Sequence, residues 1–126
     1  MSVIGIGTDL VNIKRVEKIL KSNSKNFIKK ILHKEEKLPK KITAEIIAKK
    51  FAAKESFAKA IGTGIGKTIN FTDICIDHNK SGKPIIKLDN KVKLKVLKKL
   101  KVKKANFFLS ISDDYPFALA TVIISK

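Results

Sequence analysis

Apolar and polar positions along the first third of the chain predict a strand followed by two helices. Residues 3–9 have strand character, and Asn12 can cap a helix over 13–21, where apolar residues recur at helical spacing. A second, short helix is expected over 24–32, followed by a charged, irregular connection over 34–41 that a proline interrupts. The chain therefore starts with a β-to-α unit.

The middle of the chain contains the longest predicted helix. Thr43 can cap it, the helical pattern runs to Ile61, and Gly62 ends it. Apolar runs over 69–77 and 84–88 follow, and the residues between them favour a turn. These two runs predict a hairpin.

The last third predicts one more helix and two strands. An amphipathic surface helix is expected over 90–100, and strands are expected over 106–112 and 117–124 around a turn at 113–116. No repeat and no long linker divides the sequence. We therefore expect an α+β fold in a single compact domain over residues 1–126, with one long helix and shorter helices packed on a mainly antiparallel sheet.

Composition adds limits on location and chemistry. No apolar run approaches the about 20 residues that cross a bilayer, and the N-terminal sequence lacks the features of a secretion signal. We therefore expect a cytoplasmic protein with no membrane association. The single cysteine, Cys75, excludes an intramolecular disulfide, and its apolar neighbours predict a core position. His33 and His78 have no partner at catalytic spacing, so both are expected at the surface.

The charge of +17 is typical of proteins that bind nucleic acid, an anionic membrane surface or an acidic partner. Of the 28 basic residues only Arg15 is an arginine, and this strong lysine bias weakens the charge as functional evidence. Aromatic residues make up 6% of the chain and no basic-aromatic motif is present, so a nucleic-acid-binding module is the weaker interpretation. Arg15 itself predicts a polar partner, because its guanidinium can grip a carboxylate or phosphate bidentately.

Glu55 is the most informative position of the long helix. It falls in the middle of an apolar stripe formed by Ala44, Ile47, Ala48, Phe51, Ala58 and Gly62. A lone buried charge would cost several kcal/mol, so this carboxylate must be paired, protonated or bound to a metal. A functional site is the favoured interpretation, and a salt bridge to an inward-facing lysine is the alternative.

Asp9 and Lys59 are candidates for the same site. Asp9 ends the first strand after a glycine-rich segment over 5–8, where another group can approach the backbone closely. Asp9 and Glu55 together suit a magnesium ion, although an aspartate at a strand end is also a common turn or cap residue. Lys59 lies one helical turn after Glu55, where it could meet a phosphate, neutralise Glu55 or remain solvated.

Two further segments could contact a phosphorylated ligand. Gly62, Thr63 and Gly64 begin a glycine-rich run whose backbone N–H groups could meet phosphate, but a helix C-terminus has the wrong polarity for an anion. A helix stop and turn is the alternative there. Ser110 and Ser112 share one face of a predicted strand, where they could bind a ligand or simply be exposed.

Together, these segments resemble the holo-acyl-carrier-protein synthase family of phosphopantetheinyl transferases over nearly the whole chain. The motifs are IGIGTDL at 4–10 with Arg15, FAAKESFAKAIGTG at 51–64, GKP at 82–84 and LSIS at 109–112. The resemblance implies transfer of 4′-phosphopantetheine from coenzyme A to a serine of an acidic acyl carrier protein. Adenosine 3′,5′-bisphosphate would be the second product.

The resemblance also implies roles for individual residues. Asp9 and Glu55 would hold magnesium at the coenzyme A diphosphate, Lys59 would add positive charge at the transferring phosphorus, and Arg15 would bind an acidic residue of the carrier protein. The expected coenzyme A contacts are Lys59, Gly62, Thr63, Gly64, Ser110 and Ser112. Members of the family are similar in forming homotrimers with active sites at subunit interfaces.

One position departs from the family pattern. Asp113 stands where the family usually has a histidine, and an aspartate cannot offer a cation to a phosphate of coenzyme A. This departure leaves open a relative that binds carrier protein without catalysis.

Overall fold

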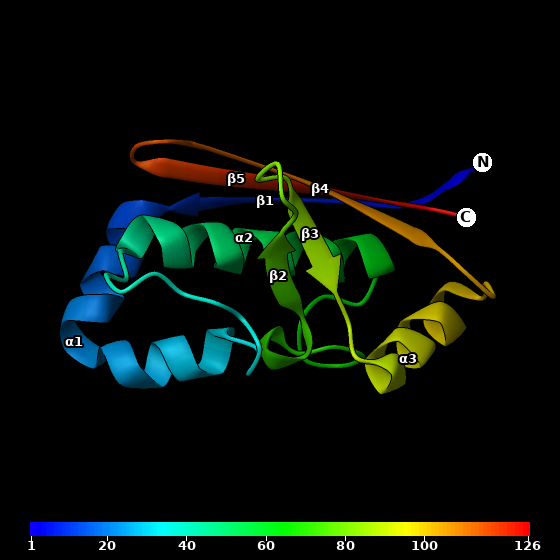
Figure 1. The fold of residues 1–126 in the computed structure, drawn as a ribbon, viewed down its shortest axis with the longest axis horizontal. Coiled ribbons are helices and arrows are strands. Elements are labelled where there is room, and N and C mark those ends of the chain that lie inside the picture. Colours follow the sequence, from blue (N-terminus) through cyan, green and yellow to red (C-terminus); the bar gives the residue numbers. More distant parts are fainter.

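A three-stranded antiparallel sheet forms one layer of the computed structural model, which describes residues 1–126 (Figure 1). The strands are β1 (Val3–Asn12), β4 (Asn106–Asp114) and β5 (Phe117–Ser125), in the order β1-β5-β4. Each runs slightly further than the sequence pattern predicts. The two chain ends meet beside each other, where Ser2 and Lys126 exchange backbone hydrogen bonds.

The long helix α2 (Ala44–Ile61) lies along one face of this sheet (Figure 1). Its predicted ends are confirmed: the Thr43 side chain accepts a hydrogen bond from the N–H of Ile46, and Gly62 adopts a left-handed φ of 96°. The buried surface of α2 is wider than the apolar stripe that the sequence predicts. Eleven of the 18 helical residues are buried, because other segments cover the sides of α2 that the sheet does not reach.

The backbones of strand β1 and helix α2 are in direct contact at two glycines. A Cβ atom at Gly5 would collide with the carbonyl of Ala60, and one at Gly7 would collide with the carbonyl of Ser56. Glycine is therefore required at both positions, which confirms the close approach predicted there. This contact brings the end of β1, with Asp9, against the middle of α2.

Helix α1 (Ile13–Ile31) replaces the two helices expected in this region. Its predicted cap is confirmed, because the side chain of Asn12 accepts a hydrogen bond from the N–H of Lys14 at 3.0 Å. The backbone leaves helical geometry only at Asn23, with φ −155° and ψ 53°, so the two predicted helices are halves of one kinked helix.

The hairpin of β2 (Cys75–His78) and β3 (Pro84–Lys87) forms a separate two-stranded sheet. The strand expected over 69–77 begins only at Cys75, because residues Phe71–Asp73 form the 3-10 helix η1. The N–H of Asn70 donates to Asp73 Oδ2 at 2.9 Å and stabilises that turn. Cys75 is buried, as predicted.

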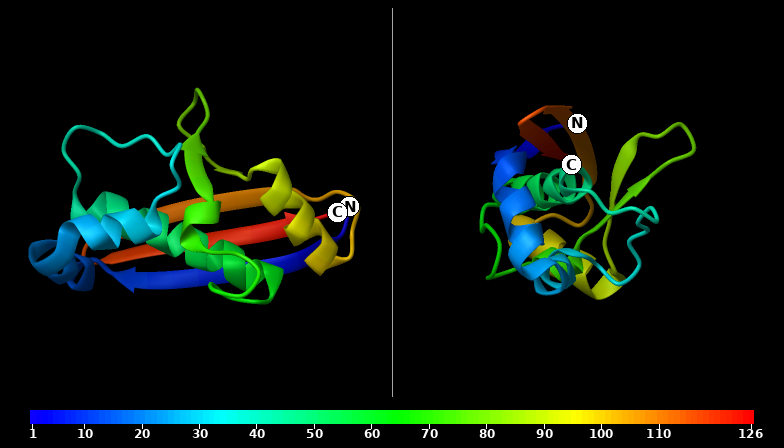
Figure 2. Two further views of the ribbon diagram at one scale, coloured as in Figure 1. Left: turned by 90° about the horizontal axis from the view of Figure 1, so that it is seen from below. Right: turned by 90° about the vertical axis from the view of Figure 1, so that its left-hand side faces the viewer.

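Helix α3 (Asn90–Leu100) confirms the predicted amphipathic helix and completes the fold. All three helices lie on the same side of the three-stranded sheet (Figures 1 and 2). The other face therefore exposes large apolar side chains: Ile6, Leu10, Phe108, Phe117, Leu119 and Ile123. No helix is both long and apolar enough to span a membrane.

Candidate active site

A cavity of about 350 Å³ lies between β1, α1 and α2. Asp9, Arg15, Glu55 and Lys59 line it together, so the structure brings four of the predicted site residues into one place. Its apolar wall includes Val11, Val16, Ile19, Phe27 and Phe51. The cavity follows from the fold, since the approach of β1 to α2 sets Asp9 beside Glu55 while α1 closes the third side.

The two carboxylate oxygens of Asp9 have different surroundings. Oδ1 accepts a hydrogen bond from Lys59 Nζ at 3.0 Å, and the same ammonium donates to the carbonyl of Thr8 at 3.0 Å. Oδ2 is buried and has no hydrogen-bond partner. Lys59 therefore pairs with Asp9 rather than with Glu55, and one oxygen of Asp9 remains available to a ligand.

Glu55 is half-buried and forms no hydrogen bond or salt bridge within the chain. Burial raises the pKa of its carboxyl above the ordinary value, the negative charge of Asp9 adds to the rise, and Lys59 opposes it. The alternative of a salt bridge to an inward lysine is wrong, since the inward lysines of α2, Lys50 and Lys54, both pair with Glu36.

The residues present fit a magnesium ion. An unpartnered oxygen of Asp9 and an unpaired Glu55 face one cavity. A cation between them would stabilise the charged form of both carboxyl groups. The chain contains no cluster of three or more acidic, histidine or cysteine side chains that could bind a metal without other ligands. Two carboxylates suit magnesium, which commonly keeps waters and substrate phosphates as its remaining ligands.

Arg15 lies in the first turn of α1 at the same cavity. Its side chain is exposed and forms no hydrogen bond or salt bridge within the chain. The polar partner that the sequence predicts is therefore not supplied by this chain, and the guanidinium is free to bind another molecule.

The remaining predicted contacts do not line this cavity. Gly62, Thr63 and Gly64 close the C-terminal end of α2, where the N–H groups of both glycines donate to the carbonyl of Ala58. Ser110 and Ser112 are exposed on β4. Ser110 is in register with Thr121, and Thr121 with Thr8, so the two serines lie on the face of the sheet opposite to Asp9.

Comparison with known proteins explains this arrangement. Residues 5–120 match the family model of the 4′-phosphopantetheinyl transferase superfamily. The chain is also 45% identical to the holo-[acyl-carrier-protein] synthase of Pelagibacter ubique, with 100% of this chain and 99% of that protein covered. The chain belongs to the holo-acyl-carrier-protein synthase family. The corresponding protein of Ruthia magnifica is 44% identical, over 97% of this chain and 96% of its own.

Solved structures of holo-acyl-carrier-protein synthases share the α+β fold. The Neisseria meningitidis protein matches with a TM-score of 0.85 and 37% identity over 99% of this chain and 100% of its own. The Helicobacter pylori protein, solved in complex with coenzyme A, matches with a TM-score of 0.82 and 34% identity over 95% and 99% of the two chains. The fold and family expected from the sequence are confirmed.

Asp113, which the sequence resemblance marked as a departure from the family pattern, has a partner in its own chain. Its Oδ1 lies 3.0 Å from Lys49 Nζ, and the hydrogen bond from Lys49 lowers the pKa of Asp113. Burial acts to lower the pKa of Lys49, but the bonds to Asp113 and Glu45 outweigh it and raise that pKa. The ammonium of Lys49, on α2, thus neutralises the charge of the extra carboxylate.

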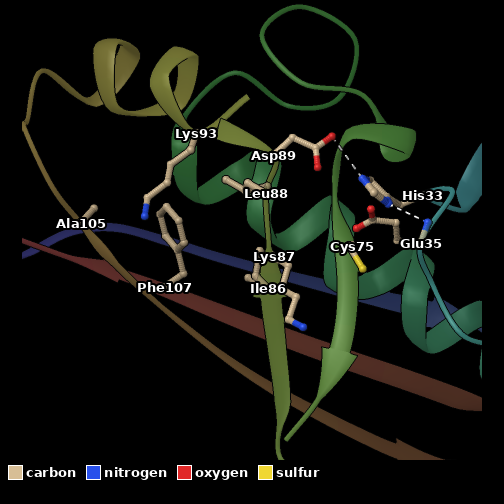
Figure 3. Close-up of a pocket in the computed structure, with 10 residues that line it drawn as sticks. All are labelled: His33, Glu35, Cys75, Ile86, Lys87, Leu88, Asp89, Lys93, Ala105 and Phe107. Carbon is tan, nitrogen blue, oxygen red and sulfur yellow. Dashed lines mark hydrogen bonds and ion pairs between the residues drawn. The ribbon is translucent and has the colours of Figure 1, made fainter. Parts of the chain in front are cut away.

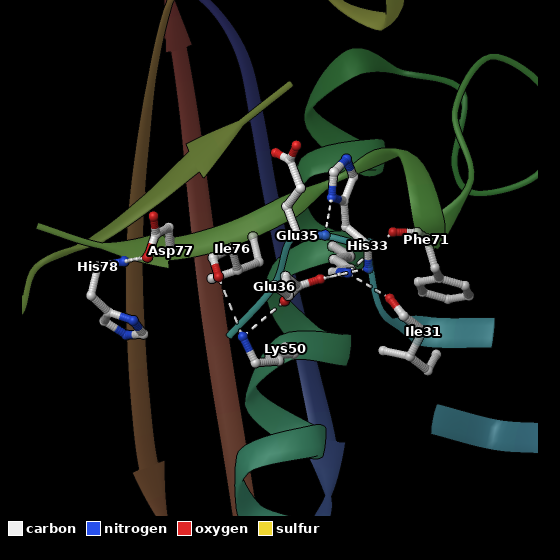
Figure 4. A network of polar contacts seen from close by, with 10 residues as sticks. Ile31, His33, Glu35, Glu36, Lys50, Phe71, Ile76, Asp77 and His78 are labelled. Atoms are coloured by element: carbon white, nitrogen blue, oxygen red, sulfur yellow. Dashed lines mark hydrogen bonds and ion pairs between the residues drawn. The ribbon is translucent and has the colours of Figure 1, made fainter. Parts of the chain in front are cut away.

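Sequence reasoning missed a buried charge cluster next to the candidate site and misplaced one histidine. Glu36 pairs with Lys50 and Lys54, and all three side chains are at most 9% exposed (Figure 4). Nothing in the sequence distinguishes Lys50 and Lys54 from the many other lysines of the chain. His33, expected at the surface, is 4% exposed; the N–H of Glu35 donates to its Nδ1, and its Nε2 lies 3.5 Å from Asp89.

The expectation for His78 is confirmed, since that residue is exposed. His33 is buried because the connection after α1 folds against the start of α3. There it lines a second cavity, of about 370 Å³, with Cys75, Asp89 and Phe107 (Figure 3). None of the predicted site residues borders that cavity.

Proposed function

We propose that this protein transfers 4′-phosphopantetheine from coenzyme A to a serine of an apo acyl carrier protein, with Asp9 and Glu55 as the magnesium ligands. One observation carries the assignment of the site: the buried, unpartnered Oδ2 of Asp9 shares a cavity with the unpaired Glu55. In the reaction the serine oxygen bonds to phosphorus and releases its proton. The bond from phosphorus to the oxygen of adenosine 3′,5′-bisphosphate breaks.

Each polar residue of the cavity has a part in this proposal. Asp9 and Glu55 would hold the ion, which when bound neutralises phosphate charge and the charge that develops on the leaving group. Lys59 is held in place by Asp9 and the carbonyl of Thr8, and its side chain remains 49% exposed. It therefore offers a fixed ammonium to a phosphate that enters the cavity.

Coenzyme A would extend from the cavity towards the end of α2. Gly62, Thr63 and Gly64 begin three residues after Lys59 and are the proposed backbone contacts for coenzyme A. The Bacillus anthracis relative, 34% identical to this chain, was solved in complex with coenzyme A (3′,5′-ADP), which supports the ligand class.

A homotrimer would complete the site. Ser110 and Ser112 cannot reach the cavity of their own chain from the opposite face of the sheet, but they could contribute to the site of a neighbouring subunit. The same face exposes Ile6 at 68% and Leu10 at 63%, which is typical of a surface that another subunit covers. We therefore propose that this face forms the subunit interface.

Arg15 and the surrounding charge favour an acidic carrier protein. Its guanidinium has no partner in the chain and lies at the cavity where the serine must enter. A bidentate bond to a carboxylate of the carrier would orient that protein, and the net charge of +17 would favour its approach. The proposal places the reaction in the cytoplasm.

Mass spectrometry of an apo carrier protein tests the function. Incubation with this protein, magnesium and coenzyme A should add the mass of one phosphopantetheine group to the carrier. A carrier whose acceptor serine is replaced by alanine, and a reaction with a chelator, should show no gain. Binding of coenzyme A without any mass gain would instead support the non-catalytic relative that Asp113 left open.

A further inference from the structure

A closed network of charges lies on the side of α2 that faces away from the three-stranded sheet (Figure 4). One of its members, Lys54, directly precedes Glu55 in the sequence. The side chains of Glu36 and Lys54 are fully buried, and that of Lys50 is 9% exposed. Glu36 comes from the connection between α1 and α2, and both lysines come from α2. The function proposed above uses none of these three residues.

Lys54 joins three separate segments to α2. Its ammonium donates to the carbonyl of Ile31 at 2.5 Å, to the carbonyl of Phe71 at 3.2 Å and to Glu36 Oε1. These are the last residue of α1, the first residue of η1 and the connection between the helices. All three N–H donors of the ammonium are thereby used.

Lys50 has fewer and different attachments. It donates to Glu36 Oε2 at 2.8 Å and to the carbonyl of Ile76, in β2, at 3.3 Å. It therefore shares the carboxylate with Lys54 but does not contact the end of α1. The two lysines form a natural pair for comparison, because removal of either one leaves Glu36 with one cation.

From these contacts we infer that Lys54 is a positioning residue, which fixes the rotation of α2 so that Glu55 points at Asp9. Successive side chains of a helix differ by about 100° in direction, so anchoring Lys54 also fixes the direction in which Glu55, the next residue, points. The inference rests on the proposed function, in which Glu55 is a metal ligand.

The chemistry of the network favours a geometric role over a purely stabilising one. Burial lowers the pKa of Lys54, and its bond to Glu36 opposes that shift. A buried ion network often stabilises a fold no more than well-packed apolar side chains of similar volume. What the ions add here is a fixed, directional attachment immediately next to Glu55.

The test compares Lys54→Met with the matched control Lys50→Met. Magnesium is titrated calorimetrically into each folded variant with coenzyme A present and no carrier protein. We expect Lys54→Met to weaken magnesium binding on the order of tenfold, as the loss of outer partners of metal ligands does, and Lys50→Met to weaken it by less than about threefold. Thermal melts show whether the two variants are folded. If Lys54→Met is not folded, Lys54→Gln is measured in its place.

Three results would overturn the inference or part of its basis. Equal magnesium affinity in the Lys54 variants and the wild type would make Lys54 a structural residue only. An equal loss in both Lys→Met variants would place the effect in the network as a whole. Absence of magnesium binding by the wild type would remove the metal assignment itself, which separates failure of the proposed function from failure of this inference.

Discussion

Two groups of charged side chains lie next to each other along α2, and they differ in how fully they are paired. In the group of Glu36, Lys50 and Lys54, every charge has a partner within the chain and no side chain is more than 9% exposed. In the group of Asp9, Glu55 and Lys59, the cation is 49% exposed, one oxygen of Asp9 has no partner, and Glu55 has none at all.

The comparison shows that burial of charge does not by itself mark a binding site in this protein. Buried polar groups in folded proteins are nearly always hydrogen-bonded, so a saturated network requires no ligand. An unpartnered carboxylate oxygen in a cavity, beside a second carboxyl whose pKa is raised, is the kind of exception that functional sites produce.

Glu36→Gln should have the largest effect on stability. It leaves two buried ammonium groups without a carboxylate, and we expect a loss of about 3–5 kcal/mol in the free energy of unfolding. Urea denaturation measures the loss. Glu35→Gln is the matched control, because Glu35 is the exposed neighbour and the change in charge is identical. Similar stabilities of the two variants would show that the paired group is not structural.

Glu55→Gln should reverse this pattern, with activity lost and the fold retained. Transfer should fall by more than about 100-fold, since even outer partners of metal ligands contribute 10- to 100-fold. Glu45→Gln, at an exposed position on the same helix, should keep its activity. A Glu55→Gln protein that melts early but retains full activity per folded molecule would assign Glu55 to the structural group.

The difference in stability between Glu55→Gln and the wild type should also depend on pH in a defined direction. The folded pKa of Glu55 is raised, so the native state binds the proton more tightly and stability falls as pH rises from the unfolded to the folded pKa. The amide removes this loss. The variant should therefore match or exceed the wild type in urea at neutral pH without magnesium, and the difference should shrink below the unfolded pKa.

These contrasts also separate what the sequence predicts from what it does not. Glu55 could be identified because an acidic residue among apolar helical positions is unusual. Lys50 and Lys54 could not, because in a chain with 27 lysines these two resemble residues of a solvated face. The burial of His33 depends on Asp89, which is distant in sequence. The alternation along the strand predicts that Ser110 and Ser112 share one face of the sheet. It does not predict which side of the sheet that face is on.

Arg15→Lys should have an intermediate effect. The substitution keeps the charge and removes the bidentate fork, so we expect KM for carrier protein to rise about tenfold, with KM for coenzyme A unchanged. Steady-state kinetics with each substrate varied in turn measures this. Lys14→Arg, next to it on α1, is the control for altered surface charge geometry. An equal rise for both substrates would remove Arg15 from carrier recognition.

Asp113→Asn should have the smallest effect. It removes an ion pair with Lys49 in which each of the two side chains is about one-third exposed. The loss in the free energy of unfolding should therefore be about 0.2–1 kcal/mol, and it should be smaller in high salt. Thermal melts at two salt concentrations test this. A much larger loss would show that the pair is part of a structural network like that of Glu36.

The most direct test of the contrast between the two groups is a calorimetric titration of magnesium in the presence of coenzyme A. The wild type, Glu45→Gln and Lys50→Met should each bind one ion, whereas Asp9→Asn and Glu55→Gln should show no measurable binding. The unpaired carboxylates would then be the metal site. Magnesium binding of unchanged affinity in Asp9→Asn and Glu55→Gln would contradict the account.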